Sequence, residues 1–407
     1  MSRIYKHILS LPVIVAALGY FVDIYDLLLF SIVRVPSLQS LGVPQEQLLD
    51  KGIFLINIQM AGMLVGGILW GIIGDKKGRL SVLFGSIILY SIANILNTFV
   101  GSIGQYAVLR LIAGIGLAGE LGAGITLVAE ILPKKIRGFG TAVVASVGLL
   151  GAVLAYGISH WFNWKITYLA GGILGLILLV LRFNVFESGS FKKMKEEKVQ
   201  RGNFLILFSS YKRFFKYLRC ILIGIPIWFV IGILITFSPE FGKAAGITEA
   251  VDAGKAVMFC YIGLSLGDLS SGLISQWLKS RKKAVLLYSL FTVISSLCYL
   301  LQYASNIKVF YFLCFCMGFS IGYWALFVTI AAEQFGTNIR ATVATTVPNF
   351  VRGSINIFTP LFLFWKIKYG VIVSAGIVGG GAIVIALLSL WRMEETFHKD
   401  LDYCEDI

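Results

Sequence analysis

Six charged side chains interrupt stretches of the sequence that are otherwise apolar. They are Asp23, Asp26, Arg110, Glu120, Asp268 and Arg352. An unpaired charge at the centre of a bilayer costs at least about 2.5 kcal/mol on the most lenient insertion scale, so such residues have a partner or a function. A carboxylate there can bind and release a proton, and a guanidinium can bind an anion. These residue types therefore indicate proton transfer and anion binding inside a membrane.

Asp26 and Arg110 are expected at the same depth. At ~1.5 Å per residue, Asp26 lies ~26 Å along the first apolar stretch, counted from Leu9, and Arg110 reaches about that level from the other side. We expect a carboxylate–guanidinium pair, either for proton coupling or only to hold two helices in register. Asp23 and Glu120 are further proton-coupling candidates, and Glu120, between glycines, is equally suited to helix packing.

Arg352 is expected near the middle of a later span. It lies ~18 Å beyond Arg340 along a helix, and Asn349 and Asn356 share its face at i−3 and i+4. One interpretation is a permanent structural pair with Asp268, which lies at comparable depth. The other is a wet cavity, in which the planar guanidinium donates two hydrogen bonds to a substrate carboxylate.

The composition indicates that membrane-spanning helices position these charges. Of the residues, 57% are hydrophobic and 14% charged, and the mean hydropathy is +0.85. A membrane-spanning helix needs ~20 apolar residues, and the chain divides into twelve such spans. We place them at 9–33, 52–73, 80–99, 105–131, 139–160, 166–182, 219–238, 255–277, 284–304, 309–332, 341–365 and 370–391. The predicted fold class is therefore an all-α membrane protein.

The charge distribution orients these spans. Most of the 35 Lys and Arg residues fall on the side that carries both termini, so we expect both termini in the cytoplasm and the net charge of +14 to be a topology signal. Nucleic-acid binding is a poor explanation of it. Asp23 and Asp26 interrupt the first apolar run, which argues against a cleavable signal peptide. We expect an integral protein of the bacterial inner membrane, with the lipid bilayer as its surroundings.

A duplicated pattern divides the chain into two halves. Glu130 precedes Arg137, and Glu333 precedes Arg340, by the same spacing, and both acids close a long apolar run. Duplicated helical halves usually enclose a solute site that opens to one side at a time. We predict a six-helix half at 1–182, a cytoplasmic linker at 183–218, and a second six-helix half with a short cytoplasmic tail at 219–407.

The strongest local motif follows the second span, at Gly71-Ile-Ile-Gly74-Asp75-Lys76-Lys77-Gly78-Arg79. Its glycines allow close helix approach and a tight turn, and its acid among bases can form an ion pair that breaks when the halves rock. With Arg110-Leu-Ile-Ala-Gly114-Ile-Gly116, the Glu130…Arg137 segment and Arg182-Phe-Asn-Val-Phe-Glu187-Ser188, the sequence resembles the major facilitator superfamily, closest to its metabolite:proton symporter and sugar-porter-like branches.

The resemblance implies a twelve-helix secondary transporter with two pseudo-symmetric halves. Proton-coupled sugar porters pair an acid on helix one with an arginine on helix four, and protonation of the acid releases the arginine; Asp26 and Arg110 match these positions. Gly71, Gly74, Asp75, Lys76, Gly78 and Arg79, with Glu130, Arg137, Glu333 and Arg340, would form the gates. The cavity-lining positions of the family point to Tyr25, Gln59, Trp228, Tyr323 and Trp324 as substrate contacts, beside Arg352.

Enzymatic readings have little support. The three His residues (His7, His160 and His398) suit neither a metal cluster nor a catalytic triad, and no glycine-rich phosphate loop follows a strand. We therefore expect no enzyme activity, metal or cofactor. The leading prediction is a monomeric, proton-coupled importer of a small organic acid or related metabolite. The alternatives are a proton-driven exporter and a receptor that does not transport.

Overall fold

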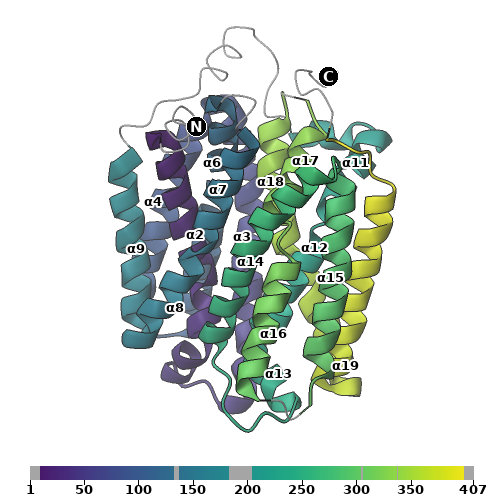
Figure 1. The fold of residues 1–407 in the computed structure, drawn as a ribbon. Coiled ribbons are helices and arrows are strands. Elements are labelled where there is room, and N and C mark those ends of the chain that lie inside the picture. Colours follow the sequence, from purple (N-terminus) through teal and green to yellow (C-terminus); the bar gives the residue numbers. More distant parts are fainter. Residues whose placement is uncertain (1–9, 133–136, 183–203, 304–305, 337, 398–407) are drawn as a thin grey trace.

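The protein is an all-α bundle whose long helices run approximately along one axis (Figure 1). The computed structural model describes residues 10–132, 137–182, 204–303, 306–336 and 338–397. The helices before residue 183 gather on one side of the bundle and those after residue 203 on the other, as the sequence colours of Figure 1 show.

The helices of the first half are α2 (Leu11–Ser40), η1 (Gln45–Gln47), α3 (Leu48–Lys77), α4 (Arg79–Asn97), α5 (Ile103–Leu117), α6 (Glu120–Ile131), α7 (Arg137–Leu149), α8 (Gly151–Trp161) and α9 (Trp164–Leu181). Those of the second half are η3 (Phe204–Phe208), α11 (Tyr211–Leu222), α12 (Ile225–Phe229), the π-helix η4 (Val230–Ile235), α13 (Ser238–Ala244), α14 (Ala253–Trp277), α15 (Arg281–Leu301), α16 (Ile307–Ser320), α17 (Trp324–Glu333), α18 (Arg340–Gly353) and α19 (Ile355–Trp391).

The described residues contain 11 helical stretches long and apolar enough to cross a membrane. The last of them, Thr342–Trp391, is 50 residues long and turns back at Gly370, whose φ of 77° and ψ of 179° are not helical. A glycine adopts this positive φ without the clash that a Cβ would cause. Because Gly370 divides this stretch into two spans, the expected number of twelve is confirmed.

Several spans are interrupted near their middle. Span four breaks between α5 and α6, span ten between α16 and α17, and span seven passes through the π-helix η4. Interrupted membrane helices expose backbone groups that must be satisfied by other parts of the protein, and transporters use such breaks to form solute sites. These breaks lie close to the buried charges described below.

Two predicted boundaries were wrong. The first helix of the second half begins at Tyr211, before the expected start at residue 219, so the residues 211–218 are not linker. The first span continues through Pro36 to Ser40, beyond the expected end at residue 33. Residues 183–203 of the predicted linker lie outside the described part of the chain.

Basic residues distinguish the two ends of the bundle. We call one end the basic end: α3, α14 and α19 finish there and α4 and α15 begin there, and these helix ends carry Lys76, Lys77, Arg79, Lys279, Arg281, Lys282, Lys283 and Arg392. The opposite end carries Arg34, Lys51, Lys165, Lys243, Lys255 and Lys308. In Figure 1 the basic end is at the top, where α2 begins and α19 ends.

Candidate functional site

Arg352 on α18 is the centre of the candidate site. Its side chain is 1% exposed, and its guanidinium carbon lies 5.3 Å from the ring centre of Trp324 and 5.9 Å from that of Trp228. Nη1 donates a hydrogen bond to the Asn349 side chain over 3.3 Å. Nε and Nη2 have no hydrogen-bond partner in the described protein. A buried, aromatic-flanked cation therefore keeps two of its donors unused.

The two unused donors have a particular geometry. Nε and Nη2 point from the same edge of the planar guanidinium, and this edge donates two parallel hydrogen bonds to a carboxylate. The indole faces around the cation favour a positive charge and offer flat apolar surface. The arrangement at Arg352 thus matches a planar anion better than it matches a neutral polyol.

The site includes residues of both halves. Trp324 donates its Nε1 hydrogen to the hydroxyl of Tyr20 on α2 over 3.0 Å. Asp23, one turn further along α2, is 0% exposed, interacts electrostatically with Arg352, and has no hydrogen-bond partner at either carboxylate oxygen. A solute held at Arg352 would therefore lie between the two halves.

The break between α16 and α17 positions Trp324. Gly322 packs against Gly267 so closely that a Cβ on it would lie 2.4 Å from the Gly267 backbone. Asp268 then accepts a hydrogen bond from the Ala325 backbone N–H over 2.7 Å, at the first turn of α17. Carboxylates stabilise helix N-termini in this way. Asp268 thus caps α17.

The predicted permanent pair between Asp268 and Arg352 is wrong for this structure. Neither residue has the other as an ion-pair or hydrogen-bond partner, because Asp268 is turned to α17 while Arg352 lies between the two indoles. Arg352 instead contacts Trp228, Trp324 and Asn349, and the alternative, a wet cavity at Arg352, stays a prediction. Of its predicted polar neighbours, Asn349 contacts Arg352, whereas Asn356 donates to the Gly353 carbonyl.

Asp26 and Arg110 also do not pair directly. Arg110 donates instead to the side-chain oxygen of Gln59 and lies 5.6 Å from the ring centre of Phe30. Asp26 faces Gly171 on α9, and neither of its oxygens has a hydrogen-bond partner. The two residues do interact electrostatically. The two residues are therefore close enough to interact, but they form no direct pair.

Glu120 forms the tightest ion pair of the first half. Its two carboxylate oxygens accept from Nη1 and Nη2 of Arg182 over 2.6 and 2.7 Å, and both side chains are 1% exposed. Arg182 also donates to the Leu83 carbonyl. Arg182 ends the sixth predicted span, and the sequence assigns it no partner. Its burial supports the packing interpretation of Glu120.

Three other predicted substrate contacts lie elsewhere. Tyr25 donates to the Thr167 carbonyl over 2.8 Å within the first half. Tyr323 donates to the Ile223 carbonyl within the second half. Gln59 binds Arg110 and donates to the Leu27 carbonyl. Of the predicted aromatic contacts, the structure brings only Trp228 and Trp324 to Arg352.

The motif after α3 closes the basic end. Asp75, which is 3% exposed, accepts from the backbone N–H of Thr342 over 3.0 Å and from its hydroxyl, so a residue of the first half caps α18 of the second. Arg79 lies 3.6 Å from Asp75 and donates to the Gly74 carbonyl. Lys76 is exposed. Its role in the gate stays a prediction.

The glycines of the motif have separate tasks. A Cβ on Gly71 would lie 3.4 Å from the Thr342 Cα, so Gly71 allows α3 and α18 to approach. Gly74 packs against Val82 of the same half. Gly78 has a φ of 101°, which permits the sharp turn between α3 and α4.

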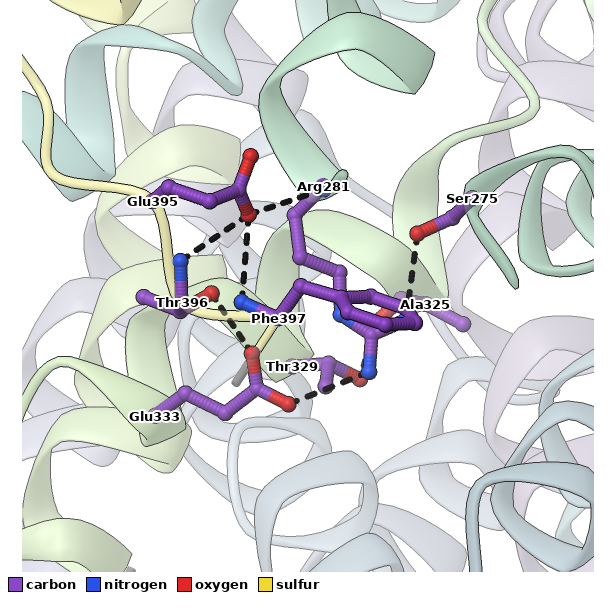
Figure 2. Close-up of polar contacts among 8 residues, drawn as sticks. All are labelled: Ser275, Arg281, Ala325, Thr329, Glu333, Glu395, Thr396 and Phe397. Atoms are coloured by element: carbon purple, nitrogen blue, oxygen red, sulfur yellow. Dashed lines mark hydrogen bonds and ion pairs between the residues drawn. The ribbon is translucent and has the colours of Figure 1, made fainter. Parts of the chain in front are cut away.

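The two gate candidates of the second half, Glu333 and Arg340, have different partners. Glu333 binds Arg281 over 3.2 Å and accepts from Thr396 over 2.6 Å, as Figure 2 shows. Arg340 instead donates to the carbonyls of Ala332 and Phe335 at the end of α17. The side chains of Glu130 and Arg137 in the first half lie outside the described part.

The segment after α19 is held in the same cluster. Glu395 accepts from the Arg281 backbone N–H over 2.9 Å, at the first turn of α15 (Figure 2). It also accepts from the Ser280 hydroxyl. Partial burial acts to raise the pKa of Glu395, but the hydrogen bonds from Ser280, Arg281, Phe397 and Lys282 together lower it.

An ion pair that the sequence analysis did not predict joins the halves at the opposite end. Arg34 of α2, 0% exposed, donates over 2.8 and 2.9 Å to the two carboxylate oxygens of Glu240 on α13. Asn57 and Thr359 exchange a hydrogen bond between α3 and α19 over 2.9 Å. The two halves are thus in contact at both ends. Pro36 lies three residues beyond the expected span end, and a proline usually ends or kinks a helix, so no sequence signal indicated that α2 continues past Arg34 to Ser40.

The fold and the buried charges define a class of protein, a helical membrane transporter with a site between two halves. The chain matches the family model of the Major Facilitator Superfamily over residues 16–360, and it belongs to this superfamily.

Relatives and solved structures agree with this assignment. The chain is 25% identical over 357 residues to a Bacillus subtilis (strain 168) protein named for niacin/nicotinamide transport, covering 86% of each chain. It is 30% identical over 201 residues to a benzoate transport protein of Acinetobacter baylyi, covering 46% and 42%. In fold it resembles the proton:xylose symporter XylE, with a TM-score of 0.75, 17% identity and 98% coverage of both chains.

Proposed function

We propose that this transporter imports a small planar organic acid together with a proton. The observation that carries the proposal is the guanidinium of Arg352, buried between Trp228 and Trp324 with Nε and Nη2 unused. A carboxylate would fill both donors, and an aromatic or heteroaromatic ring would pack on the indoles. The relatives named for niacin and benzoate transport support this substrate class.

Proton coupling is assigned to Asp26, with Asp23 beside it. Both carboxylates are 0% exposed and lack hydrogen-bond partners in the described protein, and Arg110 and Arg352 provide the nearby positive charge. A buried carboxylate that changes its charge in response to a moving cation can link proton uptake to the arrangement of the helices. The fold shared with a proton:xylose symporter supports this assignment.

Alternating access would use the closures at the two ends. Asp75 and Thr342 would separate to open the basic end, and Arg34 and Glu240 would separate to open the opposite end. We assign the basic end and both termini to the cytoplasm of a bacterium. The two halves, 1–182 and the part from Tyr211 on, would form one monomeric transport unit.

The test uses the purified full chain in detergent and in liposomes. We expect nicotinate and benzoate to raise the melting temperature, nicotinamide to do so less, and xylose not at all. Arg352→Lys keeps the charge but loses the planar fork, so nicotinate should stabilise this variant much less. An inward proton gradient should drive radiolabelled nicotinate into liposomes. Equal stabilisation by nicotinamide and nicotinate would refute the anion site, and proton-driven efflux would favour the exporter.

A further inference from the structure

One face of α4 carries a row of buried polar side chains. Ser86, Tyr90, Asn94 and Asn97 follow one another at helical spacing, and all four are 0% exposed. Residues spaced by three or four lie on one side of a helix, ~5–6 Å apart. The other side of α4 carries exposed apolar residues such as Ile88 and Ile92. A polar row therefore faces the interior of the first half.

Most of these polar groups have no protein partner. The Tyr90 hydroxyl and both side-chain polar atoms of Asn94 and of Asn97 make no hydrogen bond in the described protein, and neither does the hydroxyl of the adjacent Ser91. A buried polar group without a partner is costly, and in native proteins such groups are satisfied by water when the protein offers none. So many along one row indicate a file of bound water.

The row leads to Asp26. The Asn94 side chain lies beside the Asp26 carboxyl and acts on it as a hydrogen-bond donor, although the contact falls outside strict hydrogen-bond geometry. Tyr90, one turn closer to the basic end, interacts electrostatically with Asp26 and Glu120. Other charged groups that act on Asp26 are Asp23 and Arg110.

Glycines of α9 provide the room for this row. A Cβ on Gly171 would lie 2.2 Å from the Asp26 carboxylate, and a Cβ on Gly175 would lie 2.0 Å from the Ser91 hydroxyl. Any larger residue at these positions would displace the polar groups. The helices α2, α4 and α9 thus pack closely around these polar groups, away from the Trp228 and Trp324 site.

The two ends of the row differ. Towards the basic end it reaches Ser86, whose hydroxyl donates to Glu120 over 3.2 Å, and Glu120 is held by Arg182 in the buried ion pair. Towards the opposite end it finishes at Asn97, next to Thr98 at the partly exposed end of α4. The ion pair obstructs one end, and only one residue separates the other from the surface.

We infer that the polar face of α4 is a hydrated path that delivers protons from the opposite end of the bundle to Asp26, separately from the solute site at Arg352. The inference rests on the proposed proton coupling at Asp26. Each transfer moves one proton along the file of water, and it ends when the Asp26 carboxylate gains that proton and loses its charge. In an importer this proton would enter from outside the cell.

The hydration is tested first, without any substrate. Hydroxyl-radical footprinting by synchrotron X-rays, read by mass spectrometry, modifies buried side chains that lie beside bound water. We expect Tyr90 to be modified several-fold faster than Tyr299, which is also buried but donates its hydroxyl to the Leu234 carbonyl over 3.0 Å. Equal, slow modification of both tyrosines would overturn the inference.

The delivery of protons is tested second. The infrared band of the Asp26 carboxyl is identified by its loss in Asp26→Asn, and its hydrogen–deuterium exchange is followed after transfer to D2O. Asn97→Leu and, as a second variant, Asn94→Leu should slow this exchange several-fold, whereas Ile92→Val on the exposed face of α4 should not. Unchanged exchange in folded Asn97→Leu and Asn94→Leu proteins would overturn the path.

These results are separable from the proposed function. If nicotinate is not transported but Tyr90 is labelled and the Asp26 exchange depends on Asn97, the path stands and the substrate proposal falls. If proton-driven uptake occurs but Tyr90 is not labelled, Asp26 receives its proton from the space between the halves, and the path is refuted.

Discussion

Glu120 and Arg182 form a bidentate ion pair inside the first half, with oxygen–nitrogen distances of 2.6 and 2.7 Å. The two residues are 62 positions apart in the sequence. The pair joins the start of α6 to the end of α9, and Arg182 extends it to the Leu83 carbonyl on α4. It therefore stabilises the packing of three helices around the polar face of α4.

The first prediction concerns this pair. Glu120→Gln should lower the free energy of unfolding by ~3–5 kcal/mol, because it leaves the Arg182 charge buried and uncompensated. The double variant Glu120→Leu/Arg182→Met should recover much of this loss, since it removes both charges. Denaturant or thermal unfolding in detergent measures both. A Glu120→Gln protein of unchanged stability would support the alternative, a proton site at Glu120.

The second prediction concerns coupling. Asp26→Asn should abolish the accumulation of nicotinate under an imposed proton gradient and leave exchange of internal for external nicotinate largely intact. The physical reason is that the amide resembles the protonated acid but cannot release a proton. Uptake and counterflow in the same liposomes provide the comparison. Full accumulation by the variant would remove Asp26 as the coupling residue.

The third prediction concerns Asp268. The amide oxygen of Asp268→Asn can still accept from the Ala325 N–H, so this variant should fold and lose less than ~1 kcal/mol, whereas Asp268→Ala should lose ~0.5–2 kcal/mol as helix caps do. Thermal unfolding of the two variants measures the difference. A collapse of expression for Asp268→Asn but not for Asp268→Ala would contradict the capping role.

The fourth prediction concerns the opposite end. Glu240→Gln should weaken the contact with Arg34 and open this end more often, so that a cysteine probe placed near Glu240 reacts faster with a water-soluble maleimide. The exposed Glu249 on the same end provides the matched control, because Glu249→Gln removes a charge that pairs with no described residue of the other half. Equal labelling in both variants would mean that the Arg34 pair does not hold the halves together.

The fifth prediction concerns pH. The pKa of Glu395 is lower in the folded protein than its usual value. The folded state therefore binds fewer protons at this carboxylate than the unfolded state does, and the ionised Glu395 stabilises the fold at pH values above its usual pKa. This stabilisation should be lost as the pH falls through the lowered pKa. Melting temperatures of the wild type between pH 7 and pH 3 should therefore fall more steeply than those of Glu395→Gln. Parallel curves would contradict the prediction.

The sequence predicted the span number, the duplicated halves and the burial of Arg352, because these follow from local hydrophobicity and from the cost of a charge in lipid. It also placed Asp26 and Arg110 at a common depth through the helical rise. It did not predict which partner each charge has. Arg110 forms its hydrogen bond with Gln59, and Asp268 forms its hydrogen bond with Ala325. These partners depend on the directions of the side chains, which the spacing of residues along a helix does not determine.

Long-range partners were the main omission. Arg34 and Glu240 are 206 positions apart, and Arg182 looked like a loop charge because it directly follows α9. Helix breaks were missed for a related reason, since the apolar run continues through Gly322 and through η4 without a change in composition. The polar row on α4 was visible at i, i+4, i+8 and i+11, but only the structure shows that its groups lack protein partners.

The two ends of the bundle are closed by different kinds of interaction. At the basic end a buried carboxylate caps a helix, whereas at the opposite end an arginine meets a Glu240 side chain that is 22% exposed. Dissolved ions screen a partly exposed pair much more than a buried hydrogen bond. Because one end must close when the other opens, the resting orientation of the empty transporter would follow the salinity of the medium on one face of the membrane. The salt concentration outside the cell would thus set the fraction of empty transporters that are open to that side.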